Sequence, residues 1–207
     1  MKILNLYAGI GGNRKLWKDC QVTAVEFNPD IAAIYSHFYP DDNLIVGDAH
    51  QYLLDHYKEF DFIWSSPPCP SHSKIRKMGV QVGCYPAVYP DISLWEEITL
   101  LKHFCKAPWV IENVSIYYEP IIQPAFSLDR HLFWSNFYVP FKKFSGRGVE
   151  HKKINGANHT IFGVNISKFK CTEKRKLLRN MVNPEVGQYI LNTAAGRQIK
   201  EDQLNLF

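Results

Sequence analysis

Two residues in the sequence offer the chemistry of a nucleophile and of an acid, and each stands where an apolar segment ends. Residues 60–66 (FDFIWSS) lead into the loop PPCPSHS, which places the thiol of Cys69 just beyond a predicted strand. A cysteine thiolate can add to an electrophilic ring carbon. Residues 108–114 (PWVIENV) present Glu112 where the apolar run stops. A carboxyl group that partial burial keeps protonated can donate a proton to a heterocycle, so the two residues would act on one ring if their strands lie close together. Taken singly, Cys69 is more typical of a packed interior cysteine, and Glu112 of a surface carboxylate at the end of a strand.

A glycine turn and two carboxylates indicate a nucleotide-like ligand. Residues 7–12 (YAGIGG) directly follow the first apolar segment and open a segment predicted to be helical. Their glycines allow the backbone to turn sharply and to approach a ligand closely. Glu26 ends the next predicted strand, where an acidic side chain typically accepts hydrogen bonds from ribose hydroxyls. Asp48 ends the strand after that and could accept a hydrogen bond from an exocyclic amino group.

Alternating strands and helices are needed to bring these residues together. Segments rich in β-formers recur at residues 2–7, 21–27, 43–48, 60–66, 108–114 and 131–137. Segments with helical spacing lie between them, at residues 29–38, 51–57 and 92–104, and a last helix is predicted after Asn183, with Pro184 in its first turn. This alternation predicts an α/β fold with a mainly parallel sheet flanked by helices on both faces. Ligands bind at the carboxyl edge of such sheets.

Length and composition exclude several classes of protein. A chain of 207 residues with 46% hydrophobic residues is expected to form one compact domain. No apolar run approaches the roughly eighteen residues of a membrane span and no leader pattern precedes the first strand, so neither a membrane partner nor secretion is expected. The five cysteines are irregularly spaced and include no CxxC pair. A disulfide framework or a bound metal is therefore not expected, and a cytoplasmic location is.

The basic charge of the chain is concentrated in one segment. Residues 141–179 contain eleven Lys or Arg and two Glu, a net +9, whereas the rest contains thirteen basic and eighteen acidic residues, a net −5, which gives the +4 of the whole chain. Such a local excess favours contacts with the phosphates of a nucleic acid, although a solvated lysine-rich surface has the same composition.

The motifs together resemble those of the DNA cytosine carbon-5 methyltransferases, which use S-adenosylmethionine. The segments that resemble the family's motifs, in the family's order, are LNLYAGIGG, VEFNPD, VGDAH, SSPPCPSHS, IENV and the late segment LRNMVNPEVGQYIL. The resemblance implies a Rossmann-like fold of the S-adenosylmethionine-dependent methyltransferases. Two positions depart from the family pattern: Asn5 stands where aspartate is common, and Pro70 stands where glutamine usually follows the cysteine.

The resemblance implies a DNA (cytosine-5-)-methyltransferase that acts through a covalent adduct. Cys69 would attack carbon 6 of cytosine while Glu112 protonates or hydrogen-bonds ring nitrogen 3, so that carbon 5 accepts the methyl group. Arg130, either alone or together with His131, would hold the cytosine carbonyl and the Cys69 loop. Because a stacked base is out of reach, the target base is expected to flip out of the duplex. The products would be 5-methylcytosine and S-adenosylhomocysteine.

The residues that the resemblance assigns to the cofactor come from five of the motifs. They are Tyr7, Ala8, Gly9, Gly11, Gly12, Glu26, Phe27, Asp48, Ala49, Pro67 and Asn180.

The resemblance also divides the chain into three parts. Residues 1–140 would form the catalytic and cofactor-binding core, residues 141–179 a short basic target-recognition insertion, and residues 180–207 a C-terminal helix that returns to the core. The nucleic-acid contacts are predicted for Ser73, Lys142, Lys143, Arg147, Lys152 and Lys153. Phosphate contacts position a protein without reading sequence, so short or loose specificity is expected.

Other functions remain open from the sequence alone. The substrate is expected to be duplex DNA with a cytosine-containing site, in a bacterial or phage setting that could include restriction and modification. Transfer RNA methylated at cytosine carbon 5 is the first alternative. Methylation of an amino group is the second, because SPPC is close to the loops of such enzymes. The third is a catalytically weak nucleic-acid-binding subunit that needs a recognition partner.

Overall fold

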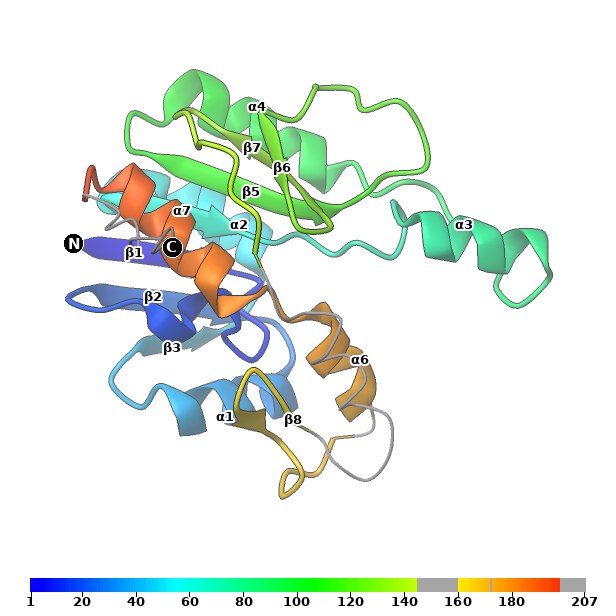
Figure 1. Cartoon of the computed structure of the whole chain (residues 1–207), viewed down its shortest axis with the longest axis horizontal. Helices are drawn as coiled ribbons and strands as arrows, with labels where there is room; N and C mark the ends of the chain where they lie inside the picture. The colour runs from blue at the N-terminus through cyan, green and yellow to red at the C-terminus, as the bar shows by residue number, and fades with distance from the viewer. Residues whose placement is uncertain (145–159, 172, 198–207) are drawn as a thin grey trace, which may run out of the picture.

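A single seven-stranded sheet forms the centre of the computed structural model, which describes residues 1–144, 160–171 and 173–197 (Figure 1). The strand order is β3-β2-β1-β4-β5-β7-β6. The strands are β1 (Lys2–Leu6), β2 (Gln21–Glu26), β3 (Asn43–Val46), β4 (Phe62–Ser65), β5 (Trp109–Val114), β6 (Phe126–Leu128) and β7 (His131–Ser135). The α/β fold with a mainly parallel sheet is therefore confirmed.

The strand order reverses at β1, which pairs in parallel with both β2 and β4. β3 extends one side of β1 and β5 extends the other, again in parallel. The carboxyl ends of these five strands consequently meet at one edge of the sheet. A reversal of this kind opens a crevice at that edge, where ligands of α/β proteins bind.

Strand β7 runs antiparallel to both of its neighbours in the seven-stranded sheet, β5 and β6. In this register Glu112 lies opposite Phe133, and Val114 lies opposite His131. The start of β7 therefore reaches the same edge of the sheet as the end of β5. The sequence predicted a strand at residues 131–137, but neither its direction nor the short β6 beside it.

Helices cover both faces of the sheet, as expected. They are α1 (Pro29–Phe38), α2 (Ala49–His56), α3 (Lys74–Gln81), α4 (Ser93–Phe104), α6 (Lys174–Asn180) and α7 (Pro184–Ala194), with 3-10 turns η1 (Asn13–Leu16) and η2 (Tyr57–Glu59). Neighbouring residues of a strand point to opposite faces. Ile3 thus packs on the side of α1 and α7, whereas Leu4 packs on the side of α2 and α4. Figure 1 shows α7 lying across one face of the sheet near β1.

Local signals in the sequence explain where several helices begin. The side chain of Asn28 accepts hydrogen bonds from the backbone of Asp30 and Ile31 at the start of α1, and Pro29 occupies the first turn. At the start of α7, the side chain of Asn183 likewise accepts a hydrogen bond from the backbone of Glu185, and Pro184 occupies the first turn. A side-chain acceptor before a proline satisfies donors that the helix leaves unpaired.

Several further elements were not predicted from the sequence. The glycine turn leads into the 3-10 turn η1 rather than into a full helix. Helix α3 has no buried residue and projects away from the sheet in Figure 1. Most of helix α6 and a hairpin of β8 (Thr160–Ile161) and β9 (Val164–Asn165) lie within residues 141–179, the predicted short basic insertion.

The described part of that segment packs on the core. Ile161, Val164 and Leu178 form a buried cluster with Ile34 of α1 and Ile10 of the glycine turn. The hairpin and α6 are therefore attached beside the carboxyl edge of the sheet. Of the helices in the described residues, none has the length and apolar character needed to cross a membrane.

Candidate active site

A cavity of about 480 Å³ opens at the carboxyl edge of the sheet, where the strand order reverses. Its walls come from the glycine turn, from the ends of β2 to β5, from the start of β7 and from the end of α6. Most residues singled out in the sequence line it: Tyr7, Ala8, Gly9, Gly12, Glu26, Phe27, Asp48, Ala49, Pro67, Cys69, Glu112, Arg130 and Asn180. Gly11 and Ser73 do not belong to its walls.

The glycine turn forms one wall through an unusual backbone. Tyr7, Gly9 and Gly11 all have positive φ angles, of 53°, 56° and 75°. A Cβ atom on Gly12 would lie 2.7 Å from the carbonyl oxygen of Val182, so only glycine allows the C-terminal segment to pack this closely. Gly11 serves the turn itself, and its carbonyl oxygen accepts a hydrogen bond from the hydroxyl of Tyr39 at 2.8 Å.

The carboxylate of Glu26 is fixed at the bottom of this wall. Its two oxygens accept hydrogen bonds from the backbone nitrogens of Gly9 and Asn28, each at 2.9 Å. Because a carboxylate oxygen can accept a second hydrogen bond, Glu26 is still able to receive two hydroxyl groups of a ligand. The neighbouring Phe27 is 75% exposed at the mouth of the cavity, so its ring face is available for stacking.

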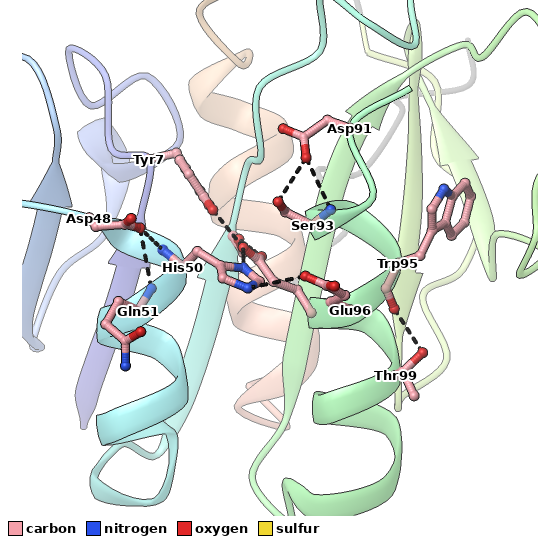
Figure 2. A network of polar contacts seen from close by, with 11 residues as sticks. Tyr7, Asp48, His50, Gln51, Asp91, Ser93, Trp95, Glu96 and Thr99 are labelled. Atoms are coloured by element: carbon pink, nitrogen blue, oxygen red, sulfur yellow. Dashed lines mark hydrogen bonds and ion pairs between the residues drawn. The ribbon is translucent and has the colours of Figure 1, made fainter. Parts of the chain in front are cut away.

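Asp48 is oriented by the helix that it begins. Its side chain accepts hydrogen bonds from the backbone nitrogens of His50 and Gln51 at 2.8 and 3.2 Å, as Figure 2 shows. The carboxylate therefore caps α2 and also lines the cavity.

The sulfur of Cys69 lies in a tight turn on the opposite wall. The carbonyl oxygen of Cys69 accepts hydrogen bonds from the backbone nitrogens of His72 and Ser73, at 3.0 and 3.1 Å. Burial, and next the carboxylate of Glu112, raise the pKa of the Cys69 thiol, while Arg130 and Lys176 oppose this shift. In this structure the group is therefore held as a thiol.

Glu112 is brought to Cys69 by direct contacts between their two segments. The side-chain nitrogen of Asn113 donates a hydrogen bond to the carbonyl oxygen of Pro67 at 3.1 Å, which joins the end of β5 to the cysteine loop. Glu112 is only 7% exposed, and its Oε1 lies 3.3 Å from Nε2 of His131. A nucleophile and an acid thus line one cavity.

Arg130 connects this wall with the C-terminal part of the chain. Its guanidinium donates a hydrogen bond to the carbonyl oxygen of Arg179 near the end of α6. The sequence left open whether His131 acts with Arg130. In the structure His131 is 3% exposed and contacts Glu112 instead.

Of the residues predicted to contact nucleic acid, the structure describes Ser73, Lys142 and Lys143, and none of these three lines the cavity. Ser73 caps α3 and accepts hydrogen bonds from the backbone of Ile75 and Arg76. Lys142 is exposed, and its ammonium lies 5.3 Å from the centre of the Tyr189 ring. Lys143 is also exposed. Arg147, Lys152 and Lys153 lie outside the described residues.

Sequence reasoning left two buried polar residues near the site without a role. His72 is fully buried, and its Nδ1 lies 2.6 Å from the hydroxyl of Tyr118, which fastens the cysteine loop to the segment after β5. Glu97 is 1% exposed and contacts Tyr7. The signal for Glu97 was a charged residue on the apolar side of a predicted amphipathic helix.

Comparisons with known proteins relate the N-terminal part of the chain to one family. Residues 1–92 match the family model described as C-5 cytosine-specific DNA methylase. The tRNA (cytosine(38)-C(5))-methyltransferase of Spodoptera frugiperda is 37% identical over 75 residues, which cover 33% of this chain and 23% of that protein. The match relates residues 1–92, less than half of the chain, to the C-5 cytosine methylases, which implies S-adenosylmethionine as the methyl donor. Cys69 lies within the matched range, and Glu112 lies beyond it.

Solved structures show similarity at low sequence identity. A DNMT2 mutant from Spodoptera frugiperda has a TM-score of 0.44 and 21% identity, over 70% of this chain and 53% of that chain. The methyltransferase EhMeth of Entamoeba histolytica has a TM-score of 0.37 and 15% identity, over 55% of this chain and 38% of that chain. The chain thus aligns with less than a quarter of the curated relative and with about half of the DNMT2 chain.

Proposed function

We propose that this protein methylates carbon 5 of cytosine in a nucleic acid, through a covalent bond between the base and Cys69. The observation that supports this most is that Cys69 and Glu112 line the same cavity as the glycine turn and Glu26. The reaction needs a thiol, a buried carboxyl group and a pocket for a nucleotide-like ligand.

The cavity suits S-adenosylmethionine. Its volume of about 480 Å³ falls within the roughly 300–1,000 Å³ usual for ligand pockets. Glu26 would accept the ribose hydroxyls, Phe27 would stack on the adenine and Asp48 would accept from its amino group. Gly9 and Gly12 would lie along the methionine part, with Tyr7, Ala8, Ala49, Pro67 and Asn180 completing the contacts. When bound, the cofactor supplies the methyl group that carbon 5 of the base receives.

Cys69 and Glu112 would divide the work on the base. The Glu112 carboxylate would take up the thiol proton and pass it to ring nitrogen 3 as the sulfur forms its bond to carbon 6. The electron pair of the former double bond thereby becomes available at carbon 5. After methylation a water molecule would take the proton on carbon 5, the bond between carbon 6 and sulfur would break to release the thiolate, and the proton on nitrogen 3 would return through Glu112 to the sulfur.

Arg130 and His131 would support these two groups. The positive charge of Arg130 lowers the pKa of Cys69 against the effect of burial, and its place in the cavity would let it hold the cytosine carbonyl. His131 fixes the orientation of the Glu112 carboxyl through their 3.3 Å contact. Arg130 lies in the turn that leads into β7, and His131 is the first residue of that strand. The position of this antiparallel strand therefore determines where both side chains lie.

Duplex DNA is the substrate that we propose first, because the family matched by residues 1–92 is named for DNA. The basic segment 141–179 would contact phosphates, with Lys142, Lys143, Arg147, Lys152 and Lys153 as its basic residues and Ser73 beside the cysteine loop. Transfer RNA is the second candidate, because the curated relative is named as a tRNA methyltransferase.

Methyl transfer from labelled S-adenosylmethionine, measured side by side on cytosine-containing duplex DNA and on unmodified tRNA, tests this proposal. Incorporation into DNA as 5-methylcytosine, and its loss in Cys69→Ser, is expected. Labelling of tRNA but not of duplex DNA would indicate that tRNA is the substrate. Methylation of an amino group, or labelling that Cys69→Ser leaves intact, would contradict the mechanism.

A further inference from the structure

Helix α4 places a carboxylate in the interior directly behind the cavity. The side chain of Glu97 is fully buried, yet Glu97 is not among the residues that line the cavity. Burying an ionised carboxylate away from water is costly unless hydrogen-bond donors replace the water. A residue of this kind needs an explanation in terms of its partners.

Three side chains from three different segments surround Glu97. Its Oε1 accepts a hydrogen bond from the hydroxyl of Tyr7 at 2.6 Å and lies 3.1 Å from Nδ1 of His50, and its Oε2 accepts from the hydroxyl of Ser65 at 2.7 Å. Figure 2 shows the side chains of Tyr7, which directly follows β1, and of His50, in the first turn of α2, converging on one point. Hydrogen bonds to an ionised acceptor are about twice as strong as neutral ones.

Each of the three partners lines the cavity or directly adjoins a residue that lines it. Tyr7 lines the cavity itself. Ser65 is followed by Ser66 and Pro67, which line the cavity. His50 is preceded by Asp48 and Ala49, which also line the cavity. One carboxylate therefore fixes the spacing between the glycine turn, the cap of α2 and the start of the cysteine loop.

The conformation of Tyr7 makes its bond to Glu97 especially significant. Its φ of 53° lies in the left-handed region, which a bulky residue rarely adopts without support. Burial and the Glu97 carboxylate raise the pKa of Tyr7, so the phenol keeps its proton and remains a donor. The strained backbone at the edge of the cavity is thus anchored by a hydrogen bond that persists at all working pH values.

We propose that Glu97 is a positioning residue for the methyl donor, which sets the distance between three walls of its pocket through Tyr7, Ser65 and His50. The inference rests on the proposed function, because it names what the pocket is positioned for. Glu97 does not touch the ligand. Its loss should therefore weaken cofactor binding and leave the chemical step intact once the pocket is filled.

Glu97→Gln tests this inference, with Glu96→Gln as its matched control. Glu96 is the neighbouring residue on α4, and its contact with His50 at 3.4 Å is largely exposed to water, where ion pairs contribute little. Binding of S-adenosylhomocysteine to the full chain is measured by calorimetry, and methyl transfer is measured at varied and at saturating cofactor. Glu97→Gln should raise the dissociation constant and the KM for cofactor by roughly three- to tenfold, since it weakens hydrogen bonds to a charged group. The kcat of Glu97→Gln at saturating cofactor should stay within twofold of wild type. The affinity of Glu96→Gln for S-adenosylhomocysteine should also stay within twofold of wild type.

Tyr7→Phe provides an independent variant if Glu97→Gln does not fold. It keeps the ring and removes only the hydroxyl, so it should weaken binding in the same direction, and the double variant should be no weaker than Glu97→Gln alone. Wild-type affinity in Glu97→Gln, or in Tyr7→Phe where the first does not fold, would overturn the inference. A lower kcat with unchanged cofactor binding would overturn it as well. Failure of the wild-type protein to bind S-adenosylhomocysteine would instead overturn the proposed function, and this inference with it.

Discussion

The thiol of Cys69 and the carboxyl group of Glu112 influence each other in the free protein. Burial and the Glu112 charge raise the pKa of Cys69, so little thiolate exists at neutral pH. The reactive form would become available only when the base and its surroundings change this balance. A thiol held back in this way is protected from adventitious alkylation, because the thiolate is the reactive species.

Removing the sulfur should abolish methyl transfer without emptying the cofactor pocket. We expect Cys69→Ser to lower kcat at least about a thousandfold, because a serine hydroxyl is a far weaker nucleophile than a thiolate. Its affinity for S-adenosylhomocysteine should stay within twofold of wild type. Calorimetry and single-turnover assays on the same preparation distinguish these outcomes, and substantial residual activity would point to methylation of an amino group.

Removing the Glu112 charge should make Cys69 easier to deprotonate. Since this carboxylate raises the pKa of the thiol, Glu112→Gln should shift the pH profile of Cys69 alkylation to lower pH. Burial remains in the variant, so the shift should be partial. The rate of iodoacetamide labelling of the Cys69 peptide, followed by mass spectrometry, measures this, with the exposed Cys84 as an internal control. An unchanged Cys69 profile would contradict the electrostatic coupling.

The same variant should also slow the chemical step. General acid catalysis contributes roughly 10²- to 10⁴-fold, and we expect a loss of that order in kcat for Glu112→Gln. Rapid-quench assays at saturating cofactor and substrate would measure it. A variant as fast as wild type would remove Glu112 from the proposed chemistry.

At the scale of single residues, the sequence predicted which residues line the cavity better than it predicted which side chains they contact. Cys69 and Glu112 could be placed together because the carboxyl ends of parallel strands meet at one edge of the sheet. The contact of His131 with Glu112 depends on the antiparallel register of β7, and the role of Glu97 depends on how α4 packs. Neither arrangement leaves a periodic signal in the sequence.

At the scale of elements, the cavity depends on the close approach of the C-terminal segment to the glycine turn. Met181 and Val182 form the wall opposite Glu26 and pack on Gly12. The same part of the molecule contains Gly187, where a Cβ atom would lie 2.3 Å from the carbonyl oxygen of Asn13. Helix α7 is thus held against η1 by two glycines.

Gly12→Ala should disturb this contact and weaken both folding and binding. The added methyl group meets backbone atoms of Val182, which cannot rotate away, and overpacking of this kind usually costs about 1–3 kcal/mol. Affinity for S-adenosylhomocysteine should fall together with the free energy of unfolding, measured by urea denaturation. Gly47→Ala is the control for stability, since its Cβ would have only an ordinary contact at 3.9 Å. Equal stability of the two variants would show that the approach is looser than described.

The elements that the sequence predicted are those with a buried, periodic face. The five parallel strands and helices α1, α2, α4 and α7 all contribute to the two main clusters of the core. Helix α3 buries no residue: Ile75 and Met78 have helical spacing, but both are exposed. The strands β6, β8 and β9 are two or three residues long and pair only locally. Segments of this length are too short for the alternation of apolar and polar residues in a strand to be recognised.

At the scale of the whole molecule, the distribution of charge suggests how a nucleic acid would be bound. Helix α6, which lies at the end of the basic segment 141–179, lines the cavity through Leu177 and Asn180, and Lys176 of that helix is close enough to Cys69 to lower its pKa. A polyanion bound to this segment would therefore lie near the cavity.

Binding of duplex DNA should accordingly weaken steeply with salt. The logarithm of the association constant falls by roughly 0.9 per phosphate contact for each unit of log salt. The double variant Lys142→Ala/Lys143→Ala should reduce this slope by up to about 2. Lys102→Ala/Lys106→Ala, near the end of α4 and before β5, is the control, because that position is at the opposite edge of the sheet. A slope that neither pair changes would remove Lys142 and Lys143 from the interface.

The central claim is the covalent bond between Cys69 and cytosine, and one measurement tests it most directly. The protein is incubated with S-adenosylmethionine and with DNA or tRNA in which the target cytosine is replaced by 5-fluorocytosine, and is then digested and analysed by mass spectrometry. Because fluorine cannot leave as a proton does, the adduct should accumulate, and the crosslinked peptide should contain Cys69. Normal turnover on the unmodified substrate, with no crosslink at Cys69 on the fluorinated one, would contradict the account.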